Sequence, residues 1–300
     1  MVRGMCTCTC KPAYSTSLTD AEWLLVAPLF PTPDPHLGGR PLKYDRRLVC
    51  DSILYVLVSG CAWRLVSHDL VPWDVAYRWF RAWAADGTWE RVHDALRDRV
   101  RRDDGRDVQP SAAVLDAQSV KTHEGGAARG YDAGKRVAGR KRHILVDTLG
   151  LLLAVAVTTA GLQDRPGGRA LLTAARPRYP RLALVWADGG YANVVDTGLI
   201  DYARDELGLR LEIVRRCDDV RGFQVLPRRW VVERTFGWLT RSRRLARDYE
   251  RKTEHAEAMI KVAMIRLMAA RLTGHHIEPH GPIETEAARR LAEDLDNNDK

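Results

Sequence analysis

Residues 182–191 read LALVWADGGY, and this stretch decides the fold class. Six apolar residues followed by an acid and two glycines are typical of a buried strand that ends in a turn. Beyond it, a helix is predicted at 194–206 and a strand at 211–215, so strands and helices alternate. Ligand sites in open α/β sheets lie beyond the carboxyl ends of strands, and Asp188 stands at such a position.

Three more strands are predicted before this stretch, at 113–120, 144–147 and 151–158. Residues 148–150, between the last two, indicate a hairpin and hence an antiparallel pair. Early antiparallel strands followed by alternating strands and helices predict an α/β fold, in which a mixed sheet is flanked by helices. Further helices are predicted at 168–175, 228–247, 254–272 and 284–295.

The residues before the sheet are expected to form an all-helical domain. Thr19, with Glu22 three residues later, is a capping box that opens the first helix. More helices are predicted at 44–59, 72–85 and 89–100, and the polar break DDGRD at 103–107 fits a domain boundary. We therefore expect a disordered leader at 1–17, a helical domain at 18–105, an α/β domain at 106–272 and a polar tail at 273–300.

Composition and charge narrow the class of protein. The net charge of +8, from 47 Lys+Arg against 39 Asp+Glu, permits a polyanionic partner without proving one. No apolar run reaches the roughly 18 residues that a membrane span needs. No signal peptide is visible either, so we expect a cytoplasmic protein with no membrane partner.

The cysteines do not predict a zinc site. None of the six forms a CxxC pair, and no such pair precedes His276 and His280 at a zinc-finger distance. The alternating run CTCTC at 6–10 fits two interpretations, a metal-binding leader or, more simply, an unstructured one with reduced thiols. Met5 is an alternative start within that leader.

Three acids stand where a carboxylate needs an explanation. Asp116 lies within an apolar strand, where an acid is costly unless it is paired or bound to metal. Asp188 follows a strand end, and Glu233 lies on a predicted helix one turn after Arg229. Converging carboxylates suit a two-metal phosphoryl-transfer site, because Mg²⁺ prefers carboxylate oxygens. Spacing alone leaves a plainer interpretation open, in which Asp188 forms a turn and Glu233 is a surface partner of Arg229.

Several long stretches carry a resemblance to a known family. They are VLDAQSVKT at 114–122, GYDAGKR at 130–136, GRKRHILVDTLG at 139–150, ADGGY at 187–191 and RWVVERTFGWL at 229–239. Through them the chain resembles the DDE transposases of bacterial insertion sequences, in the group of insertion sequence five. The N-terminal GRP at 39–41 and GCAWR at 60–64 also resemble that family's leading helical domain.

The resemblance implies a ribonuclease H-like catalytic domain that cleaves transposon ends and joins them to target DNA. It implies that Asp116, Asp188 and Glu233 are the catalytic acids and hold two Mg²⁺ ions, for which Mn²⁺ can substitute. The implied partner is double-stranded DNA, both transposon ends and target. Synapsis of two ends makes a homo-oligomer plausible in the DNA complex.

One departure from the family pattern concerns the helix that carries Glu233. Related enzymes often have a Tyr, Arg, Glu, Lys signature there, which Arg229 and Glu233 match. Leu226 stands in the Tyr place and Thr240 in the Lys place, with Arg241 next to it. An inactive or repurposed copy that only binds DNA is therefore the alternative to an active transposase, and a ribonuclease H-like nuclease without strand joining is a third candidate.

Basic residues mark the surface that is expected to bind DNA. Nine of them lie in 228–252 against three acids, an excess that an ordinary solvated helix lacks. A second cluster lies at 135–142 beside two glycines, and the stretch 125–139 is expected to become ordered on DNA.

The helices at 44–59 and 72–85 are expected to form a helix-turn-helix-like reader of the transposon ends, which makes 18–105 a DNA-binding domain. Tyr77 would then face DNA, Trp79 and Trp83 would lie in the core, and Arg40 fits either a minor-groove contact or a plain linker. The predicted DNA-binding residues are Lys135, Arg136, Arg140, Lys141, Arg142, Arg229, Arg234, Arg241, Arg243, Arg244, Arg78 and Arg81.

Overall fold

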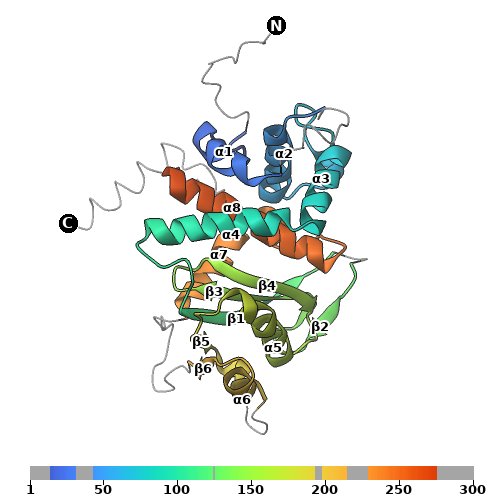
Figure 1. The fold of residues 1–300 in the computed structure, drawn as a ribbon. Helices are drawn as coiled ribbons and strands as arrows, with labels where there is room; N and C mark the ends of the chain where they lie inside the picture. The colour runs from blue at the N-terminus through green and yellow to red at the C-terminus, as the bar shows by residue number, and fades with distance from the viewer. Residues whose placement is uncertain (1–13, 32–42, 124–125, 193–197, 215–228, 276–300) are drawn as a thin grey trace, which may run out of the picture.

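The computed structural model describes residues 14–31, 43–123, 126–192, 198–214 and 229–275. A mixed sheet lies between helices on both of its faces, and the N-terminal helices lie on the far side of one helical layer (Figure 1). The predicted α/β class, with an N-terminal helical region, is therefore confirmed. The cysteine run at 6–10, Arg40, Leu226 and the helix predicted at 284–295 lie outside the described residues.

Four α-helices make up the N-terminal region: α1 (Asp20–Val26), α2 (Arg46–Ser59), α3 (Trp73–Ala85) and α4 (Thr88–Asp103). The capping box is present, because Thr19 Oγ1 accepts from the Glu22 amide at 3.2 Å and a Glu22 carboxylate oxygen accepts from the Thr19 amide at 2.7 Å. Short 3-10 helices follow α1 (Ala27–Leu29) and α2 (Trp63–Leu65).

The sheet has the strands β1 (Ala112–Lys121), β2 (Gly130–Asp132), β3 (Val137–Asp147), β4 (Leu152–Thr159), β5 (Leu184–Ala187) and β6 (Arg210–Ile213). Its order is β2-β3-β1-β5-β6, with β4 also paired to β3. The pairs of β3 with β1, β2 and β4 are antiparallel, whereas β1, β5 and β6 run parallel. Leu115 pairs with Ala187, so Asp116 and Asp188 follow directly on the last paired residues of two adjacent strands.

The remaining helices are α5 (Asp164–Ala175), α6 (Gly198–Asp205), α7 (Trp230–Thr240) and α8 (Thr253–Thr273). The prediction of one helix over 228–247 is wrong. The chain turns to extended backbone at Ser242, and Arg243–Leu245 form a 3-10 helix. Arg142 of β3 donates to the Leu245 carbonyl at 2.8 Å, a tertiary contact that competes with a continued helix.

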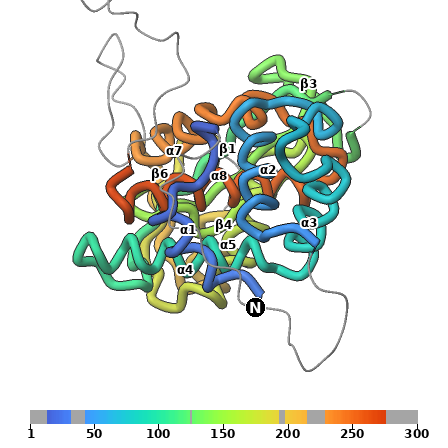
Figure 2. Tube along the Cα trace, turned by 90° about the horizontal axis from the view of Figure 1, so that it is seen from above, coloured from blue at the N-terminus to red at the C-terminus, as the bar shows by residue number. Residues whose placement is uncertain are grey.

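Two hydrophobic clusters cover the two faces of the sheet. Successive strand residues point to opposite faces, so Val114 belongs to a cluster with α7 and α8, and Leu115 to a cluster with α5 and α6. The first cluster also contains Phe80 and Leu96 from the N-terminal helices. Helix α8 contacts α4 and β4, and Figure 2 shows it running beneath α1 and α2. The N-terminal helices and the sheet therefore share one core.

Two arginines of β3 hold the chain after α7 in place. Arg140 and Arg142 are 0% and 1% exposed. Arg140 donates to the Asp248 carboxylate at 3.1 Å and the Glu250 carbonyl at 2.7 Å, and Arg142 donates to the Leu245 carbonyl. These contacts fasten 245–250 to the sheet and satisfy donors that would otherwise be buried without partners.

The stretch 125–139 is expected to become ordered on DNA, yet its described part, 126–139, already has structure without DNA. Residues 126–139 contain β2, whose Tyr131 pairs with Ala138 of β3. The Ala127 amide also donates to the Arg251 carbonyl at 3.0 Å. This stretch therefore has structure in the protein alone, which its many glycines and charges did not suggest.

We predict that Arg140→Gln lowers the free energy of unfolding by about 3–5 kcal/mol, because it leaves the Asp248 carboxylate buried without its cation. Arg136→Gln, a matched loss of one exposed charge from the same hairpin, should stay within about 0.5 kcal/mol of wild type. Urea titration followed by circular dichroism measures both, and equal stability of the two variants would contradict the buried role of Arg140.

Candidate active site

Strand β1 presents Asp116 at the sheet's α7 face. Its Oδ1 accepts from the Ala117 amide at 2.7 Å. The pKa of Asp116 is raised to about 6, chiefly by burial and also by the neighbouring Asp188, while the hydrogen bond from Ala117 and the charge of Arg229 oppose the shift. The fold therefore keeps an acid in a place where its charge is costly without a nearby cation.

Asp188 stands immediately after β5 and opens the 3-10 helix Gly189–Tyr191. Its Oδ1 accepts from the Gly190 amide at 2.9 Å. A side chain at Gly190 would meet Asp188 Oδ1 at 3.1 Å and Asp164 Oδ2 at 3.4 Å. The glycine thus leaves room for two carboxylates at one edge of the sheet.

Helix α7 brings the third acid and a cation to the same place. Glu233 lies in its first turn, and Arg229 is its N-terminal flanking residue. Arg229 Nη2 is 3.9 Å from Asp116 Oδ2, 3.8 Å from Asp188 Oδ2 and 3.9 Å from Glu233 Oε1. Three acids far apart in sequence therefore converge on one guanidinium nitrogen.

The donor set suits a hard divalent cation, because all three side chains offer carboxylate oxygens. As they stand, however, no three His, Cys, Asp or Glu side chains among the described residues are close enough to share one ion. The acid oxygens surround a guanidinium nitrogen at nearly 4 Å, whereas Mg²⁺ binds oxygen at about 2.0–2.1 Å. Metal binding thus requires these side chains to draw together.

Two lysines and two further acids lie near the three carboxylates. Lys141 is 5% exposed, and its Nζ lies 2.8 Å from Asp164 Oδ1 and 3.5 Å from Asp132 Oδ2. Lys135 Nζ donates to the carbonyl of Ala117 at 3.0 Å. Sequence reasoning missed Asp164, because the helix was predicted to begin at 168 and this acid lay in the loop before it, whereas α5 begins at Asp164.

Tyr191 is a second residue whose place could not be foreseen. Its hydroxyl is buried and has no hydrogen-bond partner among the described residues. Burial raises its pKa well above the usual value, and Asp116, Asp164 and Asp188 add to the shift. A buried donor beside three carboxylates is available to a ligand or water at the site.

The predicted DNA-binding residues divide into an outer and an inner group. Arg229 and Arg234 are half-buried, and six are exposed: Lys135, Arg136, Arg241, Arg243, Arg78 and Arg81. The other four, Arg140, Lys141, Arg142 and Arg244, are buried. Protein carbonyls and carboxylates bind their charged groups, so the structure gives no support to direct DNA contact by these four, which stays a prediction.

The segment 243–252 alternates between inside and outside. Arg244 pairs with Glu250 at 2.8 Å, and Asp248 pairs with Arg140, so both acids of the segment point inward. Its outward-facing charges are Arg243, Arg247, Arg251 and Lys252. Within the described part of the chain none of these four has a carboxylate partner, and we call them the basic segment.

The predicted reader helix α3 has both buried and exposed side chains. Trp83 is 1% exposed, as its predicted place in the core requires. Tyr77 packs against Trp63 with ring centroids 5.1 Å apart and is half-buried, so its ring faces inward, and its contact with DNA stays a prediction. Arg78 is exposed and pairs with Asp74 at 3.4 Å. Arg81 lies over the Tyr77 ring.

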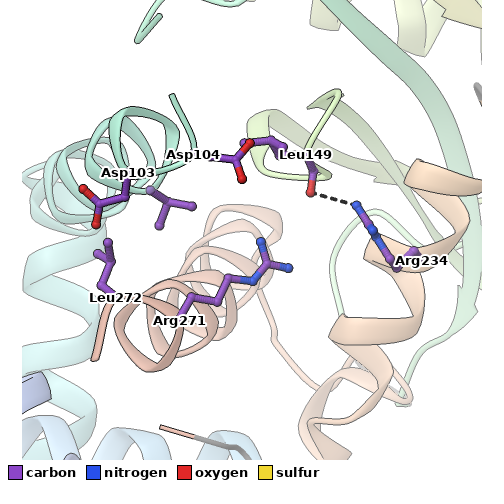
Figure 3. A pocket seen from close by; sticks show the side chains of 7 residues that line it. Asp103, Asp104, Leu149, Arg234, Arg271 and Leu272 are labelled. Carbon is purple, nitrogen blue, oxygen red and sulfur yellow. Dashed lines mark hydrogen bonds between the residues drawn. The ribbon is translucent and has the colours of Figure 1, made fainter. Parts of the chain in front are cut away.

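A cavity of about 400 Å³ lies between α4, α7, α8 and the β3–β4 turn (Figure 3). It is lined by Val100, Asp103, Asp104, Leu149, Arg234, Arg271 and Leu272. Arg234 donates to the Leu149 carbonyl at 3.0 Å and stacks on Trp230 and Trp238. Arg234 thus fixes α7 against the sheet, which places Glu233.

Two sequence families match the chain. Residues 108–268 match the transposase DDE domain, and residues 18–93 match a family described as "Putative transposase of IS4/5 family". The chain belongs to the DDE transposase family. This family generally uses divalent metal ions, and the mixed sheet of the transposase, with β3 antiparallel to β1 and β5 and β6 parallel to it, is ribonuclease H-like.

Two relatives from Burkholderia cepacia are similar to parts of the transposase. The "Insertion element IS402 uncharacterized 16.2 kDa protein" is 32% identical over 35% of this chain and 72% of its own. The "Putative transposase for insertion sequence element IS402" is 33% identical over 41% of this chain and 60% of its own. No solved structure matches. No helix among the described residues is long and apolar enough to cross a membrane.

Burial of the His143 imidazole is expected to make the stability of the protein depend on pH. His143 lies on β3, with Nε2 3.0 Å from Thr158 Oγ1, and burial lowers its pKa to about 4, which Asp164 partly opposes. As pH falls below about 6.5, the unfolded chain binds a proton that the folded chain does not. Stability contributed by neutral His143 is therefore lost between about pH 6.5 and pH 4.

We predict that His143→Gln flattens the loss of stability between pH 7 and pH 4.5 by about 2–3 kcal/mol. His68→Gln provides a matched control for the loss of one imidazole, at an exposed histidine outside this cluster. Urea titrations at both pH values measure the effect. Parallel profiles for wild type and His143→Gln would show that His143 is not the group responsible.

Proposed function

We propose that this protein is an active DNA transposase that binds transposon ends and catalyses metal-dependent DNA cleavage and strand transfer. Asp116, Asp188 and Glu233 are its catalytic acids and hold two divalent ions, Mg²⁺ or Mn²⁺. The observation that carries the proposal is the convergence of three carboxylate oxygens within 4 Å of one nitrogen.

The three acids have different roles at this site. Asp116 and Asp188 each use Oδ1 to accept from a backbone amide, which fixes the carboxylate and leaves Oδ2 directed toward the shared cation. Glu233, 49% exposed at its side chain, is the acid that can adjust. When bound, two ions supply positive charge to the attacking and leaving oxygens of a phosphodiester.

The reaction has two steps at phosphorus. Water first replaces one ester oxygen at the transposon end, which frees a 3′-hydroxyl. That hydroxyl then forms a new P–O bond with the target strand, and the target's own 3′ ester bond breaks. Because two ends must be held together for joining, we propose a homo-oligomer in the DNA complex and a cytoplasmic site of action, where the DNA lies.

The DNA-binding surface that we propose consists of the basic segment together with Lys135 and Arg136. All of these side chains are exposed, and Lys135 reaches the backbone beside Asp116. Phosphate contacts from such residues give affinity that does not depend on base sequence. We assign recognition of the DNA base sequence to α2 and α3, where Arg78 and Arg81 are exposed.

A second candidate is a copy that binds DNA without cutting it. The observation in its favour is Thr240, which stands in the family's Lys place and whose Oγ1 donates to the Gly237 carbonyl at 2.9 Å. Arg241, the next residue, is exposed and can supply a cation there. The three converging acids favour the active enzyme.

Glu233→Gln should abolish Mg²⁺-dependent cleavage and joining of DNA that carries the element's own ends, because it removes one acid charge from the metal site. DNA affinity should stay within about threefold of wild type, since phosphate contacts dominate it. Glu206→Gln, an exposed site near the end of α6, is the matched control and should retain activity. Normal cleavage by Glu233→Gln would refute the assigned site.

Binding of duplex DNA should weaken with salt, with a log–log slope of about −0.9 for each phosphate contacted. Replacing both Arg247 and Arg251 by Gln should make that slope shallower by about 0.9 for each phosphate that the variant no longer binds. Arg204→Gln with Arg210→Gln removes the same two charges elsewhere and should leave the slope unchanged. Fluorescence anisotropy at several salt concentrations measures it, and equal slopes for the two double variants would exclude the basic segment.

A further inference from the structure

We propose that Arg229 is a stand-in cation, which occupies the space between the three carboxylates in the metal-free protein and is displaced when metal and DNA bind together. The proposal deepens the proposed function and rests on it, because it treats these acids as the metal site. It assigns to Arg229 a positioning and regulatory role in addition to the plain pairing that its sequence spacing from Glu233 suggests.

The distances argue against a dedicated pair. One nitrogen, Nη2, is 3.8–3.9 Å from an oxygen of each acid. Each of these separations is longer than a hydrogen bond, which for a charged pair is about 2.7–2.9 Å. Charge alone therefore holds the guanidinium near the middle of the acids, and no single carboxylate keeps it.

The acids need such a cation when no metal is present. Asp116 and Asp188 follow the last paired residues of adjacent strands, so their charges are forced together. Among the described residues, Arg229 alone is within ion-pair distance of Asp116, Asp188 and Glu233. Lys135 and Lys141 are bound elsewhere, to the Ala117 carbonyl and to Asp164.

A metal ion and this guanidinium cannot occupy the site together. Mg²⁺ needs carboxylate oxygens at about 2.0–2.1 Å, and a guanidinium between those oxygens would both block their approach and repel the ion. Metal binding must therefore expel Arg229, and Arg229 must weaken metal binding for as long as it stays.

DNA provides a place for the displaced side chain. A phosphodiester that reacts at the three acids brings anionic oxygens beside residue 229, and the planar fork of a guanidinium matches phosphate oxygens. Transfer of Arg229 from carboxylates to phosphate clears the metal site. By linkage, DNA should then raise metal affinity, and metal should raise DNA affinity by the same factor.

The first test measures binding of Mn²⁺ alone to the full-length, metal-free protein, by the loss of the free-ion electron paramagnetic resonance signal. Without DNA, Arg229→Gln should bind Mn²⁺ about 5- to 150-fold more tightly than wild type, the usual range of a coupling free energy between two sites. Arg229→Lys should lie closer to wild type, because it keeps the charge. Arg204→Gln, an equal loss of charge on α6, should match wild type.

The second test repeats the titration with duplex DNA that carries the element's ends. Wild-type affinity for Mn²⁺ should rise by a similar factor, whereas Arg229→Gln, already released, should show little further gain. Circular dichroism and thermal unfolding of each variant establish that the compared proteins are folded.

The outcomes separate this proposal from the proposed function. If Asp116→Asn abolishes Mn²⁺ binding but Arg229→Gln binds no more tightly than wild type, the metal site stands and the stand-in role is wrong. If Asp116→Asn binds Mn²⁺ as wild type does, the metal site itself is wrong, and both proposals fall. If Arg229→Gln gains affinity but the protein cuts no DNA, the stand-in role stands and the proposed activity falls.

Discussion

The parallel register of β1 and β5 is the constraint on which the site depends. Pairing of Leu115 with Ala187 leaves Asp116 and Asp188 side by side. Both carboxylates carry negative charge, and that of Asp116 is partly enclosed. Both members of such a pair stay ionised only with a cation nearby, since like charges at short range disfavour each other. Helix α7 supplies that cation and the third acid. Its position is fixed from the other side, where Thr235 Oγ1 donates to the Gly150 carbonyl at 2.8 Å.

Buried arginines explain why charge counting misjudged the surface. In sequence, 139–143 and 243–252 look alike, two basic stretches with few acids. In the fold, Arg140 and Arg142 lie inside and hold the second stretch, whose own acids turn inward to meet Arg140 and Arg244. As a result, residues 139–143 place their cations in the interior, and residues 243–252 present cations to solvent. Only the pairing of β3 with its neighbours decides which of the two stretches is buried.

The sequence was sufficient for elements that carry a local signal. The capping box at Thr19 predicted α1, the apolar run before Asp188 predicted β5, and the turn at 148–150 predicted the antiparallel pair of β3 and β4. The family resemblance selected three acids from many. The strand β3 was predicted to begin at 144, because residues 137–143 (VAGRKRH) are mostly basic and show no apolar period. Their burial comes from tertiary pairing, as does the early end of α7. The roles of Asp164, Lys141 and Tyr191 depend on the same long-range contacts, which no local pattern encodes.

The N-terminal helices and the acids are parts of one packed structure, which bears on how DNA would be positioned. Gly60 (φ +73°) ends α2, and a side chain there would meet Arg243 Cβ at 2.9 Å. Arg244 Nη1 donates to the Cys61 carbonyl at 3.0 Å, so the loop after α2 lies against the basic segment. The boundary at residue 105 stays a prediction about folding units. Helix α7, which carries Glu233, and residues 243–252 are consecutive in the chain. With these contacts, DNA bound by both α3 and the basic segment would therefore lie at a fixed distance from Glu233. A rigid link of this kind favours cutting at a constant offset from the recognised sequence.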